Sequence, residues 1–514
     1  MEEVDILIIG SGLAGIVAAL SAADEGKNVL ILSKLDNLLS GNTHYAQGGI
    51  IFRGLEDSPE KLQKDIEIAG DGHCWSPAVK QLCELGPELV DKYLINRSNV
   101  DFDLNKSNEL DLTAEGAHSA PRIIHSKDKT GKAIHEAVIT EMLKHPNIKY
   151  KLDQTVVDLL TLSHHSKNSV DIYEKPACFG AFVLDNVSGK VYPIFAQQTI
   201  LATGGLGQLY KHTSNPAEAT GDGIALAWRA GVRCFNLEYI QFHPTTFYGA
   251  HDRFLISESM RGEGAKLMDK NGNPFMKSFH EQGDLAPRDI VARSIHQTLL
   301  ETDHPCVYLD ISFKDSNWIK DRFPTIYKNC ITRGVDMCSE PIPVVPAAHY
   351  SCGGIGVSLK GKSSLQRLYA VGEVSCTGVH GANRLASTSL LENVVWGHLA
   401  GKDAAEHCVA KPYYPAIYDW QERDQYIDPA LIAQDWENIK NTMWNYVGLV
   451  RTKQRLLRAR TIFRHLQTEI EQFYQQAKMT KSIVQLRNGM QAAIAVTQAT
   501  IEARESRGAH YLKY

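Results

Sequence analysis

The sequence predicts an α/β fold in which a parallel-sheet domain is interrupted by an α+β capping domain and followed by a C-terminal helical domain. A strand, a glycine-rich turn, a helix and a second strand occupy the first 34 residues, and strand character returns near residue 370 after a stretch rich in Pro, Gly and polar motifs. Helical spacing of apolar residues predominates from about residue 410 onward. We therefore expect one domain at 1–235 and 350–408, a cap at 236–349 and a helical domain at 409–514.

The N-terminal unit has the order of a Rossmann-like dinucleotide-binding βαβ unit. An apolar run at 4–9 leads into a glycine-rich turn and a helix, and 29–32 supplies the second strand. In such a turn the glycines allow the tight bend, the approach of a pyrophosphate and the close packing of the helix, whose N-terminal N–H groups face the phosphates. The candidate cofactor contacts here are Gly10, Ser11, Gly12, Ala14 and Gly15.

The end of the second strand departs from the usual pattern. An acidic residue normally binds the adenosine ribose there, whereas this chain has Ser33 and Lys34. Because a hydroxyl can also hydrogen-bond a ribose, we expect both residues to contact the cofactor.

Composition restricts the class of protein. The chain has 514 residues, a formal net charge of −5 and ten scattered cysteines without a CxxC pair. This charge gives no reason to expect nucleic acid as a partner, and the scattered cysteines favour reduced thiols over a disulfide framework or an iron–sulfur site. No apolar run reaches the roughly 20 residues of a membrane span, and the acidic N-terminus differs from a signal peptide. We expect a cytoplasmic protein without metal.

Several further motifs identify a family resemblance. The segment at 150–200 reads as a β-meander and 199–201 as a buried strand ending in glycines, while strand character returns at 368–371. Together with the N-terminal turn, the following motifs resemble the succinate dehydrogenase/fumarate reductase flavoproteins: Ala46-Gln47-Gly48-Gly49, Gln241-Phe242-His243-Pro244-Thr245, Arg261-Gly262-Glu263-Gly264, Pro287-Arg288-Asp289, His349-Tyr350-Ser351-Cys352-Gly353-Gly354, Gly372-Glu373 and Gly381-Ala382-Asn383-Arg384-Leu385-Ala386. Within this group, the loop at 115–125 and the tail at 502–511 are most similar to the L-aspartate oxidase family.

The resemblance implies FAD as cofactor and oxidation of L-aspartate to iminoaspartate at the first step of de novo NAD synthesis, with oxygen or fumarate reoxidising the flavin. A transient contact with quinolinate synthase is a further possibility that it raises. Membrane-bound relatives attach FAD to a histidine at the position of Asn42, so we expect non-covalent FAD here; His44 lies two residues away. The remaining cofactor contacts that the resemblance implies are Asn42, Ala46, Gln47, Gly48, Gly49, Ala202, Thr203, Gly204, Asp222, Glu373, Ser389 and Leu390.

The substrate carries two carboxylates, so its site needs cations and hydrogen-bond donors. Arg288 and Arg384 are the strongest candidates because a guanidinium binds a carboxylate bidentately. The resemblance also gives Arg288 a proton-transfer role in the succinate/fumarate half-reaction, although a free arginine holds its proton far above neutrality. Further candidate donors are His243, His349, Ser257 and Gln241. Taken singly, each histidine could equally be a buried, hydrogen-bonded core residue, and Arg288 a surface ion pair.

Glu115 is the candidate for amino-acid specificity. A carboxylate can pair with the α-ammonium of aspartate, whereas succinate and fumarate offer no positive charge there. Without the resemblance, a solvated loop glutamate would be the better interpretation.

Two other functions remain open. A soluble fumarate reductase or succinate dehydrogenase flavoprotein would share the fold, but Asn42, Glu115 and the lack of cysteine clusters argue against it. A non-catalytic FAD-binding protein would have no need of the arginine and histidine set.

Overall fold

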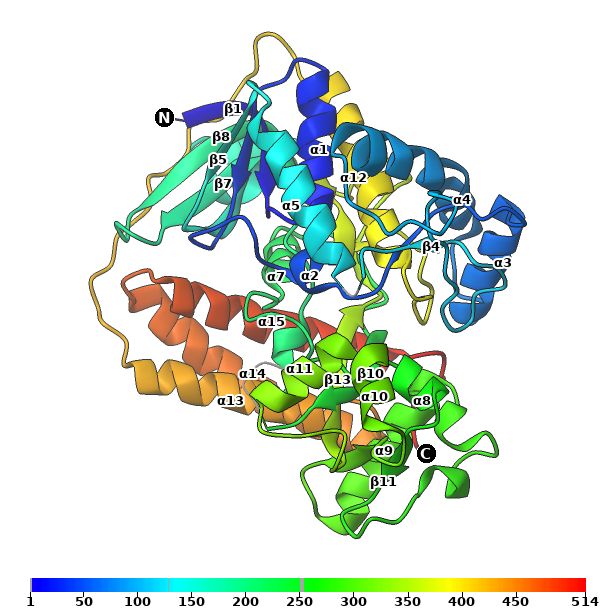
Figure 1. The fold of residues 1–514 in the computed structure, drawn as a ribbon. Helices are drawn as coiled ribbons and strands as arrows, with labels where there is room; N and C mark the ends of the chain where they lie inside the picture. Colours follow the sequence, from blue (N-terminus) through cyan, green and yellow to red (C-terminus); the bar gives the residue numbers. More distant parts are fainter. Residues whose placement is uncertain (1, 128, 250–253) are drawn as a thin grey trace.

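The computed structural model describes residues 2–127, 129–249 and 254–514 (Figure 1). Its largest sheet has seven strands, in the order β5-β2-β1-β8-β7-β6 with β15 also pairing with β8. The strands are β1 (Glu2–Ile9), β2 (Val29–Leu32), β5 (Ile148–Lys151), β6 (Gln154–Thr161), β7 (Cys178–Asp185), β8 (Val191–Leu201) and β15 (Leu368–Ala370). The predicted βαβ unit and meander are both confirmed, since β1, β2 and β5 run parallel and β6, β7 and β8 are antiparallel neighbours.

Strand β8 changes its partner along its length. Its first half pairs antiparallel with β7, and its last three residues pair parallel with β15. Residues 194–201 of β8 also pair in parallel with β1. The chain therefore leaves this sheet at Leu201 and returns to it at Leu368, as the sequence predicts.

The sheet is covered on both faces. Ile6 and Ile8 of β1 belong to the core beneath α1 (Leu13–Asp24), α5 (Thr130–Leu143) and α12 (Thr388–Glu406), whereas Leu7 and Ile9 belong to the core on the other face. This alternation follows from the two-residue period of a strand and explains why β1 is apolar without interruption. Further helices on this side of the chain are α2 (Asn42–Tyr45), α3 (Pro59–Ala69), α4 (Ser76–Val90) and the π-helix η1 (Asp91–Arg97), with the short strands β3 (Ile50–Ile51) and β4 (Ile123–Ile124).

The middle of the chain forms a separate four-stranded antiparallel sheet with its own core. Its order is β10 (Ile240–Phe247), β13 (Ile342–Ser351), β12 (Val307–Asp310) and β11 (Lys266–Met268). The helices around it are α8 (Ser259–Gly262), η4 (Met276–Ser278), η5 (Gly283–Leu285), α9 (Arg288–Thr302), α10 (Ser316–Arg322) and α11 (Pro324–Thr332). In Figure 1 this part lies below the large sheet.

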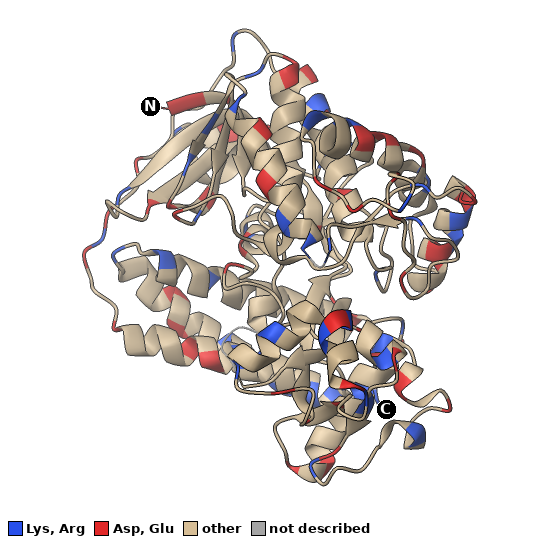
Figure 2. Cartoon of the chain, viewed as in Figure 1, with Lys and Arg blue, Asp and Glu red and all other residues tan. Residues whose placement is uncertain are grey.

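Small elements join the two parts. They are η3 (Gly207–Leu209), α7 (Asp222–Arg229), η6 (Gly372–Val374) and a three-stranded sheet of β9 (Cys234–Phe235), β14 (Gly354–Gly356) and β16 (Ser375–Cys376). Two further short helices, α6 (Leu162–His165) and η2 (Ser169–Tyr173), lie between β6 and β7. Lys, Arg, Asp and Glu are interspersed over the upper and lower parts of the ribbon (Figure 2).

The C-terminal helices are α13 (Pro429–Tyr446), α14 (Lys453–Gln476) and α15 (Lys481–Glu502), which pack beside one another below the large sheet (Figure 1). The prediction of helix from about residue 410 is wrong for the first part of this region. Residues 409–428 form no helix and run as an extended connection, with a bridge from Ile417 to Ser166. Pro412 and Pro415 explain the difference, because proline lacks the N–H of a helix and disfavours helical backbone in the residue before it. None of the helices in the described residues has the length and apolar character needed to cross a membrane.

Candidate active site

A cavity of about 2030 Å³ lies at the carboxyl ends of β1, β2 and β8 and extends to the four-stranded sheet. It is lined at one end by the glycine-rich turn and at the other by the arginine and histidine candidates. All of the predicted site residues line it except Gly15 and Gln241, which lie behind its wall. Residues that are far apart in the sequence therefore meet in one space, as expected for a ligand at the carboxyl ends of parallel strands.

The turn after β1 has the geometry of a dinucleotide cradle. Gly10 has a φ of +116°, and a Cβ added there would lie 2.2 Å from the backbone oxygen of Ala202. Only glycine allows β1 and β8 to end so close together. Leu13 N–H donates to Thr43 Oγ1 at 3.2 Å, but no side chain caps α1 at Gly12, so the other N–H groups of the first turn stay available to a phosphate. These features fit a bound dinucleotide.

Ser33 and Lys34 line the same end of the cavity. Lys34 Nζ forms an ion pair of 2.6 Å with Asp222 and also donates to Glu218 O at 2.6 Å. Ser33 Oγ donates to Asn37 O at 3.3 Å. The basic side chain that replaces the usual acidic residue is thus held at the end of β2 by a partner from α7.

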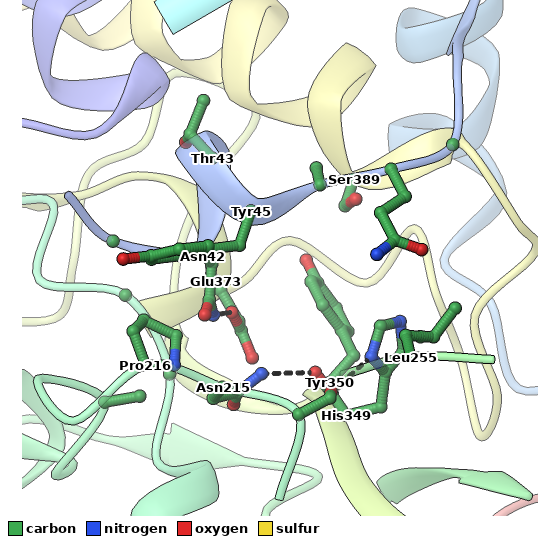
Figure 3. A pocket seen from close by; sticks show the side chains of 18 of the residues that line it. Asn42, Thr43, Tyr45, Asn215, Pro216, Leu255, His349, Tyr350, Glu373 and Ser389 are labelled. Atoms are coloured by element: carbon green, nitrogen blue, oxygen red, sulfur yellow. Dashed lines mark hydrogen bonds between the residues drawn. The ribbon is translucent and has the colours of Figure 1, made fainter. Parts of the chain in front are cut away.

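Glu373 is buried in the middle of the cavity wall. It accepts a hydrogen bond of 2.5 Å from Asn42 Nδ2 (Figure 3). It also accepts one of 3.0 Å from Ser351 N–H. Burial raises the pKa of this carboxyl to about 7. Asn42 is thereby fixed against a residue of the returning segment of the chain.

Arg384 is held by three parts of the protein. Its guanidinium lies over the ring of Tyr350 at 4.4 Å, and Nη1 donates to Ser389 Oγ at 3.1 Å. Gln241 on β10 donates to Arg384 O at 2.9 Å, and Ala509 N–H of the C-terminal tail donates to Ala382 O at 2.9 Å. Arg384 is only 8% exposed, and its Nε has no hydrogen-bond partner among the described residues. Gln241 thus holds the backbone of Arg384 and supports the cavity wall from behind.

Arg288 begins α9 and bonds through Nε to Glu258. Arg261, which is buried, reaches the same carboxylate through Nη2 at 3.2 Å and donates through Nη1 to Asp284 O at 2.7 Å. Ser257 lies beside this group and exchanges a hydrogen bond of 2.8 Å with Ser259. Two guanidinium groups therefore share one carboxylate, which leaves a net positive charge beside the cavity.

The two histidines come from adjacent strands. In the pairing of β10 with β13, Gln241 faces Tyr350 and Phe242 faces Ala348, so His349 is an extra residue in a β-bulge. A bulge re-aims its side chain, and such irregularities are frequent next to active sites. The rings of His243 and His349 meet edge to face with centroids 5.7 Å apart.

Both imidazoles are in a setting that disfavours their charged form. Burial, followed by the charge of Arg288, lowers the pKa of His243 well below its usual value. Burial and the charge of Arg384 lower the pKa of His349 to about 3. His349 Nδ1 and Ser214 Oγ form a hydrogen bond of 2.7 Å, and Asn215 Nδ2 donates to His349 O at 2.8 Å (Figure 3). Neutral imidazoles can donate hydrogen bonds to a substrate without adding charge.

Glu115 lies on a loop that is anchored by buried ion pairs between Arg122 and two aspartates. Arg122, which is fully buried, bonds to Asp57 at 2.7 Å and to Asp65 at 2.5 Å. Ser119 N–H also donates to Asp65 at 2.9 Å, and His118 Nε2 bonds to Ala386 O at 3.1 Å. The buried ion pairs therefore fix the loop whose tip places Glu115 at the cavity.

Several residues of this site were not among the sequence-predicted ones. Glu258, Arg261, Ser214, Asn215, Tyr350 and Ser387 all line the cavity. The Arg261 motif was visible in the sequence, but Ser387 and Ser214 belong to no distinctive pattern and are recognised only by their contacts. No group of three or more His, Cys, Asp or Glu in the described part of the chain is placed to hold a metal ion.

Comparison with known proteins agrees with this geometry. The FAD binding domain family matches residues 5–390, and the family described as fumarate reductase flavoprotein C-term matches residues 436–513. L-Aspartate oxidases of Pseudomonas aeruginosa and Halobacterium salinarum are 41% and 39% identical, over 99% of this chain and 94% and 96% of theirs. The solved structure of an E. coli quinol fumarate reductase variant is 25% identical, with a TM-score of 0.87 over 100% of this chain and 92% of that chain.

Proposed function

The chain belongs to the L-aspartate oxidase family of FAD-dependent enzymes. From this premise we propose which residues bind FAD and the substrate for the oxidation of L-aspartate to iminoaspartate, the first step of de novo NAD synthesis. Bound FAD supplies the acceptor for the hydride of the α-carbon and is reoxidised by oxygen or fumarate. The observation that carries this proposal is the meeting of a dinucleotide cradle, a cationic pocket and Glu115 in one cavity.

The cradle residues would hold FAD without a covalent bond. The turn from Gly10 to Gly15 would face the pyrophosphate, while Ser33, Lys34 and Asp222 would lie at the adenosine end, and residues 46–49 and 202–204 line the cavity between. Asn42, Glu373, Ser389 and Leu390 would contact the flavin half. The identity of Asn42 supports the non-covalent assignment, because an amide stands where membrane-bound relatives carry the linking histidine, and its hydrogen bond to Glu373 holds that amide in the cavity wall.

Arg384 and Arg288 would bind the two carboxylates of aspartate. The ring of Tyr350 and the Ser389 hydroxyl fix the Arg384 guanidinium in one plane, which limits the rotamer entropy lost on binding. Neutral His243 and His349 and the hydroxyl of Ser257 would add donors. Because these groups hold the substrate at both ends, they would place its α-carbon at a fixed position.

Arg288 would also handle the proton of the fumarate half-reaction. Its contact with Glu258, which in turn contacts Arg261, gives a path of charged groups that could return a proton to it. The path supports a transient transfer, after which Arg288 would regain its proton through the Glu258 carboxylate.

Glu115 would pair with the α-ammonium group of aspartate. Before hydride leaves, the ammonium group would pass one proton to the Glu115 carboxylate, so that the nitrogen lone pair can form the imine. A carboxylate at this position favours aspartate over succinate. Succinate has no ammonium group, so the negative charge of Glu115 would stay unpaired when succinate binds.

We also propose a domain division at 1–235 with 350–408, 236–349 and 409–514. The cap's own sheet and core support the division at 236–349, whereas the C-terminal helices share a core with one face of the large sheet and are set apart by the extended connection at 409–428. Closure of the cap would exclude water from the flavin. A cytoplasmic location and a transient contact with quinolinate synthase, which would receive the unstable imine, are parts of the same proposal.

The second candidate is a soluble fumarate reductase of the same fold, which the structural likeness to quinol fumarate reductase favours. Anaerobic mixing of the holoenzyme with L-aspartate or with succinate distinguishes the two. Bleaching of the flavin absorbance by aspartate alone is expected, whereas bleaching by succinate alone would establish the second candidate. Glu115→Gln should slow bleaching by aspartate, whereas the control Glu109→Gln, at an exposed acidic residue six positions earlier in the chain, should bleach like the parent.

A further inference from the structure

The carboxylate of Glu115 is held between two other segments of the chain. Ser387 Oγ donates a hydrogen bond of 2.8 Å to Oε2 of Glu115. Its other oxygen, Oε1, has no hydrogen-bond donor among the described residues and lies so close to the 46–49 loop that a Cβ added to Gly48 would be 3.1 Å away. One oxygen is thus used by the protein and the other stays available at the cavity.

Ser387 has an unusual conformation for this contact. It precedes α12 as the N-cap residue with a φ of 59°, in the left-handed region that favours glycine. A serine at an N-cap ordinarily accepts a hydrogen bond from the first turn of its helix, whereas this side chain makes no such bond. Its hydroxyl instead reaches across to a loop that is 272 residues away in the sequence.

A second contact joins the same two segments. His118 Nε2 bonds to the backbone oxygen of Ala386, next to Ser387, at 3.1 Å. The loop that carries Glu115 is therefore attached to the start of α12 at two points. Strained backbone of this kind persists only where its surroundings fix it, and it is concentrated at functional sites.

We propose that Ser387 is a positioning residue for amino-acid specificity, which holds Glu115 through Oε2 so that Oε1 faces the α-ammonium group of the substrate. The inference rests on the proposed role of Glu115. A donor to an ionised carboxylate both stabilises its charge and fixes its rotamer. Substrates without an amino group gain nothing from this contact.

Steady-state kinetics of holoenzyme variants test the proposal. In Ser387→Ala, kcat/KM for aspartate oxidation should fall roughly 10- to 100-fold, the range for a hydrogen bond to a charged group. Fumarate reduction by the same preparation should stay unchanged, and FAD content and thermal unfolding verify that the variant is folded. Ser387→Gly is the matched control, because it also lacks the hydroxyl but suits the observed φ.

The outcomes separate the alternatives. Equal losses in the Ala and Gly variants, and no further loss when Ser387→Ala is added to Glu115→Gln, support the proposal. A loss in Ala that Gly restores, or losses that add in the double variant, would overturn it in favour of a backbone role. If Glu115→Gln impairs aspartate oxidation while both Ser387 variants do not, the inference fails and the role of Glu115 stands. If Glu115→Gln itself has no effect, the proposed function of that residue fails and the inference with it.

Discussion

The side-chain amide of Asn42 donates a hydrogen bond of 2.5 Å to Oε2 of Glu373, joining the loop after β2 to a segment 331 residues further along the chain. An amide cannot form the bond to flavin that a histidine forms. We therefore expect acid precipitation of the holoenzyme to release all of its flavin into the supernatant, measured by absorbance. Flavin that stays with the pellet would contradict this, and loss of that fraction in His44→Asn would identify the attachment site.

Glu373 should make the apoprotein less stable as the pH rises. Burial raises the pKa of its carboxyl from 4.5 to about 7. Between these values the native state holds a proton that the unfolded state releases, so the free energy of unfolding decreases as the pH increases. The contribution is up to about 3 kcal/mol, since one pKa unit corresponds to about 1.4 kcal/mol. Urea unfolding at pH 5 and pH 7.5 measures it, and Glu373→Gln should show a smaller decrease.

The buried histidines contribute with the opposite sign. Because the pKa of His349 is lowered to about 3, its imidazole binds a proton below pH 6.5 in the unfolded state but stays neutral in the native state. Lowering the pH from 6.5 to 5 therefore destabilises the protein through this residue. His349→Asn should lose less stability over that interval than the parent, while His465→Asn, on the exposed face of α14, should follow the parent.

Arg384→Lys should weaken both half-reactions. Lysine keeps the charge but loses the planar fork that binds a carboxylate, stacks on Tyr350 and donates to Ser389. We expect KM for aspartate and for fumarate to rise together, roughly 10- to 100-fold. Arg504→Lys in the exposed tail is the control. A rise for only one of the two substrates would contradict the proposed contact, because both substrates carry the carboxylate that Arg384 is expected to bind.

The anchor of the Glu115 loop should be measurable as stability. Arg122→Met leaves Asp57 and Asp65 without their buried cation, and breaking such a pair costs about 3–5 kcal/mol. Thermal and urea unfolding should show this decrease, whereas Arg53→Met, at an exposed position nearby, should have little effect. An unchanged free energy of unfolding would mean that the two aspartates find other partners.

The sequence predicts the local elements well because each carries its own pattern. The βαβ unit, the meander and the return of strand at 368–370 are all observed. The helix expected from about residue 410 begins only at Pro429, since two prolines outweigh the apolar spacing in the intervening segment.

Contacts across long sequence separations could not be predicted in this way. The residue types of Ser387 and Asn42 are common in loops, and nothing in their neighbourhood indicates that one reaches Glu115 and the other Glu373. The bulge at His349 likewise depends on the register of two strands about a hundred residues apart, which no local pattern encodes.

The double pairing of β8 has a consequence for how the protein is made. Gly10 and Ala202 can meet once the first two hundred residues have left the ribosome, but β15 and Glu373 lie beyond the whole intervening sheet. Because chains emerge from the N-terminus and long-range strand pairing is slow, the nascent polypeptide holds an unfinished edge at β8 throughout synthesis of the middle segment. We therefore expect the flavin to bind late in biogenesis, because a chain truncated before Leu368 lacks both β15 and the Glu373 carboxylate.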